Sequence, residues 1–129
     1  MSKLFVLMLM VFCHIIDDYC LQKLGCLADL KQRSWWEKNA PDFMYRDDYL
    51  VALAMHGFSW AFMVMLPIAA YMSFNPTTLF YLLFAANWVV HCIIDDLKAN
   101  KHKINLVTDQ TYHYLQIMFT AGALLYSGG

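Results

Sequence analysis

Three pairs of histidine and aspartate, each four residues apart, are the side chains of this sequence with the clearest chemistry. On an α-helix, residues i and i+4 lie on one face, with Cβ atoms roughly 5–6 Å apart. Two such side chains can bind one ion, as in helices that give adjacent ligands to zinc. The pattern therefore predicts a metal site, to which a lone His56 adds a further imidazole. The pairs are His14 with Asp18, His91 with Asp95, and Asp109 with His113.

All these residues lie in apolar stretches long enough to cross a membrane. The chain of 129 residues is 60% hydrophobic and 15% charged, with a mean hydropathy of +0.43, which is more apolar than an ordinary soluble domain. We therefore predict an all-α, polytopic membrane protein: one domain, residues 1–129, of four transmembrane helices in an antiparallel bundle. The predicted spans are residues 4–26, 49–72, 77–97 and 106–126.

Two connections between the predicted spans carry local signals. Ser73-Phe74-Asn75-Pro76 predicts a short turn, with Pro76 as the start of the third helix. Residues 28–48 place Trp35 and Trp36 among basic side chains, which suits a segment lying at the lipid headgroups. A plain loop is the alternative, and Asn39-Ala40-Pro41 should end any helix there.

Basic residues predict the orientation of the chain. Eight of the nine lysines and arginines lie in the first and third connections between the predicted spans, counting Lys23 at the start of the first connection. Only Lys3 lies on the opposite side of the membrane. By the positive-inside rule, both connections face the cytoplasm and both termini lie outside an inner (cytoplasmic) membrane. The seven histidines and aspartates named above then lie toward the cytoplasmic face. A cleaved signal peptide is not favoured, because no small-residue cleavage site follows the first apolar run.

Ionisable groups inside a membrane cost several kcal/mol unless they are paired, hydrated or bound to metal. Seven of them at one depth favour a metal site over the alternatives, which are a proton relay and a hydrogen-bonded His–Asp network. The segments around Asp17-Asp18 and Asp95-Asp96 also resemble each other, which suggests two related hairpins. Asp17 can face the same cluster, whereas Asp96 should meet the membrane interface or Lys98.

The series of motifs is also familiar. H-x-x-x-D-Y-x-x-Q at residues 14–22, a lone His56, H-x-x-x-D-x-x-K at residues 91–98 and D-Q-x-x-H at residues 109–113 resemble a family of small bacterial and phage membrane proteins known only as a domain of unknown function. That family is distantly similar to membrane-bound metal-dependent hydrolases. The resemblance covers nearly the whole chain and implies, by analogy, a hydrolase. The doubled carboxylates depart from the pattern, so either member of each doublet can be the ligand.

The donor set predicts the ion and its chemistry. Imidazole and carboxylate suit zinc, manganese or iron. Seven candidate ligands are more than one tetrahedral ion can bind. We therefore expect two ions, or a single ion with the remaining carboxylates orienting the histidines that bind it. Such a site favours cleavage of a phosphoester or pyrophosphate. Lys98, Gln110 and Asp17 are the candidate catalytic residues, although a lysine at a helix end is also a common membrane anchor.

The function predicted from these residues is a membrane-embedded, metal-dependent hydrolase at the cytoplasmic face. Its substrate could be a phospholipid, a lipid-linked phosphate or a nucleotide, and homo-oligomers remain open. One alternative is an ion or proton transporter, although the outer halves of the predicted spans lack ionisable residues. Another is a non-catalytic membrane interaction protein with a structural metal site. Nothing in the sequence supports nucleic-acid binding.

Overall fold

The computed structural model describes residues 1–24 and 26–127, and these residues form helices and connecting loops with no strand. The predicted all-helical class is therefore confirmed. The first apolar stretch forms α1 (Lys3–Ile16), the π-helical η1 (Asp17–Leu21) and α2 (Gln22–Leu24). Short helices follow: α3 (Leu27–Leu30), α4 (Arg33–Asn39) and the 3₁₀ turn η2 (Phe43–Tyr45). The long helices are α5 (Asp48–Tyr71), α6 (Thr78–Ala99) and α7 (Leu106–Ala121), which ends in the π-helical η3 (Gly122–Tyr126).

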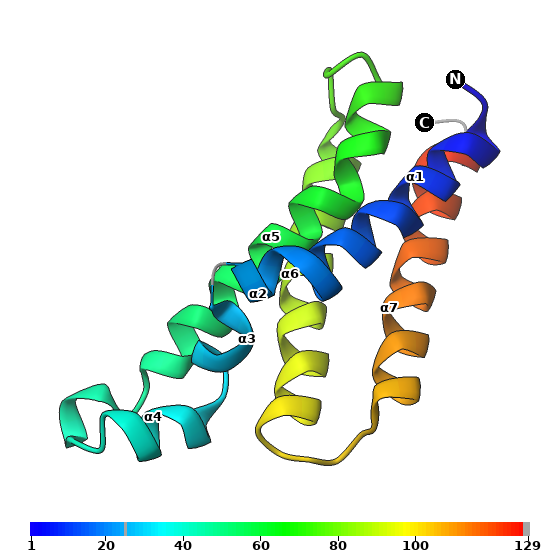
Figure 1. The fold of residues 1–129 in the computed structure, drawn as a ribbon. Helices are drawn as coiled ribbons and strands as arrows, with labels where there is room; N and C mark the ends of the chain where they lie inside the picture. Colours follow the sequence, from blue (N-terminus) through cyan, green and yellow to red (C-terminus); the bar gives the residue numbers. More distant parts are fainter. Residues whose placement is uncertain (25, 128–129) are drawn as a thin grey trace.

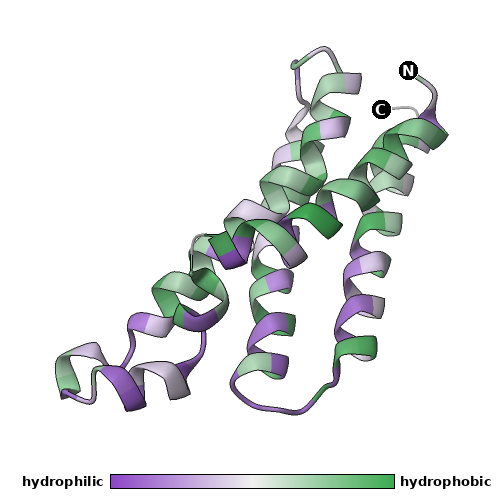
Figure 2. Ribbon diagram, in the orientation of Figure 1, coloured by the Kyte–Doolittle hydropathy of each residue, from purple (hydrophilic) through white to green (hydrophobic). Residues whose placement is uncertain are grey.

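The long helices form an up-and-down arrangement, with α5 beside α6 and α1 packed against both α5 and α7 (Figure 1). The start of α1 and the end of η3 lie together, since the Lys3 ammonium is 4.8 Å from the centre of the Tyr126 ring. The α5–α6 turn lies at this same end, and α4 and the α6–α7 loop lie at the other. Figure 2 shows that most hydrophilic residues gather at that second end.

Three segments are long and apolar enough to cross a membrane: Lys3–Leu24, Phe43–Tyr71 and Thr78–Ala99. Their large apolar side chains are widely exposed, for example Leu4 (65%), Met8 (59%) and Phe12 (57%) on α1. A bilayer covers such a surface, whereas water would leave it as an unusually large apolar patch. The fourth predicted span, α7 with η3, is not among these three segments.

The connections correct one prediction and refine another. Pro76 does not start α6, because the Thr77 hydroxyl accepts a hydrogen bond from the Phe80 amide (3.4 Å) and so caps a helix that begins at Thr78. The stretch between the first two spans is not a plain loop but contains α3, α4 and η2. Its helix α4 ends at Asn39, as the Asn39-Ala40-Pro41 sequence predicts.

An apolar core fills the end of the bundle that carries the termini. Its members include Val6, Met10, Val64, Met65 and Ile117, each no more than 1% exposed. Nearer the other end, α5 and α6 approach closely at Gly57. A Cβ added there would lie 2.3 Å from the Cys92 Sγ and 3.3 Å from the Trp88 carbonyl oxygen, so any side chain at this position displaces Cys92 and crowds the α6 backbone.

We expect Gly57→Ala to lower the free energy of unfolding by about 1–3 kcal/mol, because the added methyl overpacks the α5–α6 contact. The measurement is unfolding by SDS in mixed micelles, followed by circular dichroism. Gly122→Ala is the matched control, since a Cβ at Gly122 meets nothing within 4 Å and alanine is favoured over glycine in a helix, so this variant should not lose stability. Equal stability of the two variants would contradict the close approach.

Candidate metal centre

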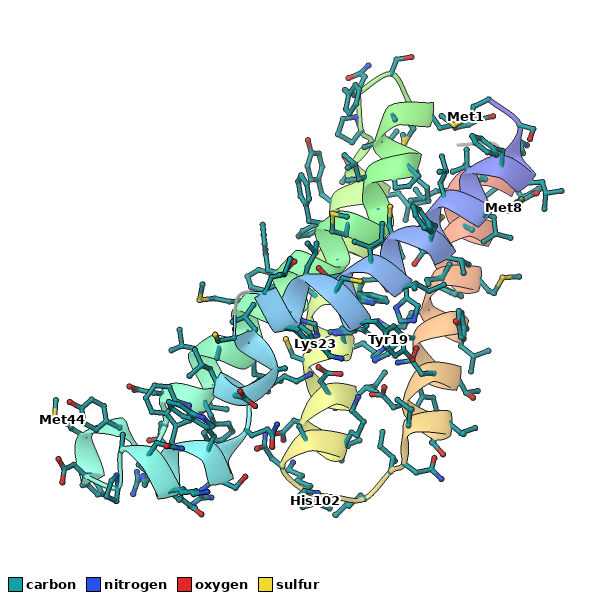
Figure 3. All side chains as sticks on the ribbon, in the orientation of Figure 1. Met1, Met8, Tyr19, Lys23, Met44 and His102 are labelled. Carbon is teal, nitrogen blue, oxygen red and sulfur yellow. The ribbon has the colours of Figure 1, made fainter. Side chains whose placement is uncertain are left out.

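The structure brings six of the seven predicted metal ligands into one buried cluster, which we call the His–Asp cluster. The six form three overlapping groups in which one ligand atom of each residue lies within 4.8 Å of the others. Figure 3 shows nitrogen- and oxygen-bearing side chains gathered beside Tyr19, where the end of the first span passes α6 and α7. The groups are Asp18 with His56 and His91, His91 with Asp95 and His113, and Asp18 with Asp109 and His113.

Side chains from the three helices α5, α6 and α7 meet at short range in the cluster. The Nε2 atoms of His56 and His91 are 3.1 Å apart, and His56 Nε2 is also 3.1 Å from Asp95 Oδ2. His113 Nε2 lies 3.2 Å from Asp109 Oδ1 and 3.5 Å from Asp95 Oδ1. None of these five side chains is more than 1% exposed. These nitrogen and oxygen atoms thus converge in the interior of the bundle, shielded from bulk solvent.

Several of these donor atoms lack a hydrogen-bond partner among the described residues. They include Asp18 Oδ1, Asp109 Oδ1 and His113 Nε2, all fully buried. Asp109 Oδ1 and His113 Nε2 are close enough to interact, but the contact does not have hydrogen-bond geometry. Buried polar atoms are almost always satisfied. Unpaired nitrogen and carboxylate oxygen atoms that face one another fit the requirements of a cation.

The charges of the buried groups are also those expected of a cation site. Asp17, Asp18, Asp95 and Asp109 are at most 7% exposed. Among the described residues, the lysines that pair with them are Lys31 on Asp95 (2.6 Å) and Lys98 on Asp109 (3.1 Å). With neutral histidines, two negative charges stay uncompensated. One divalent cation, or protons on two of the histidines, would balance them, and burial of the uncompensated charges would be costly.

A π-helical turn explains why both members of the first doublet are buried. In a regular α-helix, successive side chains diverge by roughly 100°, so adjacent residues rarely face the same site. The chain widens at Asp17–Leu21, where the Gln22 amide donates to the Asp17 carbonyl five residues earlier. Asp17 is 0% exposed and Asp18 is 7% exposed as a result. Such π-turns occur often at functional sites.

His14 stands beside the three groups rather than in them. Its Nδ1 accepts a hydrogen bond from the Trp60 indole (2.8 Å), so in the neutral ring Nε2 carries the proton and donates to Gln110 Oε1 (2.8 Å). The Gln110 amide nitrogen in turn donates to Asp109 Oδ2 (3.0 Å) and Asp18 Oδ2 (3.2 Å). Both nitrogens of His14 are engaged, and Gln110 orients two cluster carboxylates.

Asp17 lies beside His56 but forms no hydrogen bond with it. The Ser59 hydroxyl donates to Asp17 Oδ1 (2.5 Å), and Asp17 Oδ2 faces His56 Nδ1 at 3.7 Å. The other ring nitrogen of His56 points at Asp18 and Asp95. Metal-binding histidines commonly donate a hydrogen bond from their second nitrogen to a carboxylate, and Asp17 is the carboxylate nearest to that nitrogen of His56. The candidate catalytic residue Asp17 therefore lies behind His56, on the side away from the cluster centre.

The lysines differ from the sequence-based expectations. Lys31 counts among the topology-setting charges of the first connection, yet it is 5% exposed and holds Asp95. Lys98 pairs with Asp109 and keeps 28% of its side chain exposed. Asp96 does not meet Lys98 but lies 3.4 Å from Lys101. The sequence gives no signal for the Lys31–Asp95 pair, because its partners are 64 residues apart.

The donor chemistry defines what the cluster can hold. Imidazole nitrogens and carboxylate oxygens suit zinc, manganese or iron. Cys92 lies outside the three groups, with its Sγ 3.5 Å from the Leu53 carbonyl. Three groups that share Asp18, His91 and His113 accommodate one ion or two close together. The structure thus contains a buried His/Asp cluster that could hold metal, as the sequence predicts, while the identity and number of ions stay predictions.

Comparison of the chain with protein-family models, curated proteins and solved structures finds no match. The family resemblance described above therefore stays a prediction, and the argument for function depends on the cluster.

We expect Lys31→Met to lower the free energy of unfolding by about 3–5 kcal/mol in the presence of EDTA, because the variant leaves Asp95 buried beside no ammonium. Lys101→Met is the matched control, since the Lys101–Asp96 pair is exposed and worth less than about 1 kcal/mol. SDS unfolding measures both. Equal losses would show that burial of the Lys31 pair is unimportant.

Proposed function

We propose that this chain is a four-span inner-membrane protein that binds divalent metal in the His–Asp cluster and hydrolyses a phosphoester or pyrophosphate at the cytoplasmic face. The observation that carries the proposal is the set of three overlapping buried ligand groups, with ligand atoms that find no hydrogen-bond partner among the described residues. In this proposal α7 with η3 is the fourth span, and it brings Asp109 and His113 to the cluster.

Orientation follows from the basic residues and the arrangement of the helices. The cluster lies between the apolar core and the end that carries α4 and the α6–α7 loop. Lys98, Lys101 and Lys103 lie at that end, which faces the cytoplasm under the positive-inside rule. The apolar core closes the opposite half of the bundle, which supports a site with one-sided access over a transmembrane conduit.

The bound ion would act as a Lewis acid and make a water molecule more acidic. The chain's own residues supply the rest. Gln110 holds the carboxylates of Asp18 and Asp109, the Asp17 carboxylate faces the outer nitrogen of His56, and Lys98 offers a positive charge to a phosphate oxygen. In the overall reaction, a water oxygen bonds to phosphorus and the bond from phosphorus to the leaving oxygen breaks. The proton lost by water ends on that oxygen.

We expect the purified protein to contain one or two divalent ions per chain, measured by plasma mass spectrometry, and to hydrolyse bis(p-nitrophenyl) phosphate or pyrophosphate. His91→Ala should lower the metal content to near zero, because His91 belongs to two of the three groups. His102→Ala is the matched control, since His102 is an exposed residue of the α6–α7 loop. Asp18→Asn gives a second, nearly isosteric test.

Native protein without stoichiometric metal would overturn the metal site. Bound metal without hydrolysis of either substrate would indicate a non-catalytic interaction protein with a structural metal site. Metal flux into proteoliposomes would indicate a transporter.

A further inference from the structure

Two otherwise apolar stretches of α6 and α7 carry polar side chains that belong to none of the three ligand groups. They are Asn87 in residues 82–90, and Gln116 and Thr120 in residues 115–121. Asn87 is 6% exposed and Thr120 is 1% exposed. Polar groups in such surroundings are costly unless they are hydrogen-bonded. Their partners therefore show what these side chains hold in place.

The backbone of α6 decides which way the Gln116 amide points. Gln116 Nε2 donates to the Asn87 carbonyl oxygen (3.2 Å) and to Asn87 Oδ1 (3.2 Å). A backbone carbonyl can only accept, so Nε2, and not Oε1, must face it. The Asn87 side chain is held in turn, since its Nδ2 donates to the Thr120 hydroxyl (2.7 Å). Gln116 Oε1 is thereby directed at His113.

The direction of the hydrogen bond at His113 follows from this orientation. Gln116 Oε1 lies 3.1 Å from His113 Nδ1. An amide oxygen has no proton to donate, so the proton between them belongs to Nδ1. His91 Nδ1, 3.2 Å from the same nitrogen, is a second acceptor within reach of that proton. In the neutral ring of His113, Nε2 then keeps the lone pair that a metal ligand needs.

His113 Nε2 faces two carboxylates that use their other oxygen for hydrogen bonds. It lies 3.2 Å from Asp109 Oδ1 and 3.5 Å from Asp95 Oδ1. Asp109 Oδ2 accepts from Lys98 (3.1 Å). Asp95 Oδ2 accepts from Lys31 (2.6 Å). His113 belongs to two of the three ligand groups, so an ion in either group would use this nitrogen.

The spacing around His113 Nε2 fits a shared cation better than a shared proton. Two ligand atoms about 2.0–2.1 Å from a tetrahedral ion lie roughly 3.3 Å from each other. The two distances to the carboxylate oxygens are close to this value. Neither contact has hydrogen-bond geometry, since His113 Nε2 has no hydrogen-bond partner among the described residues.

His14 shows that contact with a glutamine does not by itself make a histidine a ligand. Its Nε2 meets Gln110 Oε1, but its Nδ1 is also engaged, by the Trp60 indole. No nitrogen of His14 is left for an ion, and His14 belongs to none of the ligand groups. In His113 the glutamine is bonded at one nitrogen and the other nitrogen faces the cluster.

We propose that Gln116, held by Asn87, is a positioning residue of the metal site: it keeps the proton of His113 on Nδ1 and so makes Nε2 the atom that binds the ion. This inference rests on the proposed metal site. It goes beyond that site because it names the ligand atom of one histidine and a residue outside the three groups that determines it. Outer-shell partners of metal-binding histidines act in this way.

The test uses the full-length protein in detergent micelles, loaded with zinc and carrying histidine with isotope-labelled ring nitrogens. NMR that correlates the ring nitrogens with the carbon-bound ring protons distinguishes a zinc-bound nitrogen from a protonated one, and sequential assignment identifies the His113 ring. We expect zinc on His113 Nε2 and the proton on Nδ1. This measurement uses the unmodified chain, so it does not depend on whether a variant folds.

Gln116→Met keeps the length of the side chain and removes the acceptor, so the Kd for zinc should rise by about tenfold. Gln116→Glu keeps an oxygen that can accept from His113 Nδ1 and should bind zinc more tightly than Gln116→Met does. Thr120→Val is the matched control, because it removes a buried hydrogen bond of the same group without contacting His113. Its Kd should equal that of the unmodified chain.

Zinc on His113 Nδ1, an unchanged Kd in Gln116→Met, or an equal loss of affinity in Thr120→Val would overturn the positioning role. Failure of the proposed function gives a different result. A chain that binds no zinc would refute the metal site itself, whereas a chain that binds zinc without using His113 Nε2 would refute only the role of Gln116.

Discussion

Burying Asp17, Asp18, Asp95 and Asp109 close together is the constraint on which the rest of the structure depends. Like charges at this range repel one another, and the apolar surroundings strengthen the repulsion. Two lysines offset part of the charge. A divalent cation shared by the carboxylates and neutral histidines would offset the rest, and so would protons on two of the histidines. The cluster could therefore hold a metal ion, and its charge has to be balanced in one of these two ways.

The scaffold around the cluster is organised to fix the donors in place. Trp60 holds His14, Gln110 holds two carboxylates, and Gln116 contacts the imidazole of His113. Trp60 also stacks on His91, with ring centroids 4.3 Å apart. Outer-shell contacts of this kind keep ligand geometry fixed before an ion arrives. The close α5–α6 approach at Gly57 serves the same end by setting the distance between the helices that carry His56 and His91.

Helical periodicity and the i, i+4 pairs were enough to predict the helices and to anticipate the cluster. The sequence repeat between the first and third spans suggests equivalent roles for His14 and His91, which the structure does not show. His91 lies in two ligand groups, whereas His14 is hydrogen-bonded to Trp60 and Gln110. Equivalent spacing does not fix equivalent surroundings. The Lys31–Asp95 pair could not be predicted from the sequence either, since it depends on how a connecting segment folds back onto α6. Family-level knowledge would not replace these contacts, which come only from tertiary packing.

The π-turn at Asp17–Leu21 has a consequence for how the chain can vary. A π-turn holds one residue more than the α-helix that would otherwise occupy its place. Deleting a single residue within the π-turn would restore a regular helix, in which the side chains of Asp17 and Asp18 diverge by about 100°. The doublet could then no longer turn both carboxylates inward. The extra residue of the π-turn is therefore what lets both carboxylates of the doublet face the interior of the bundle.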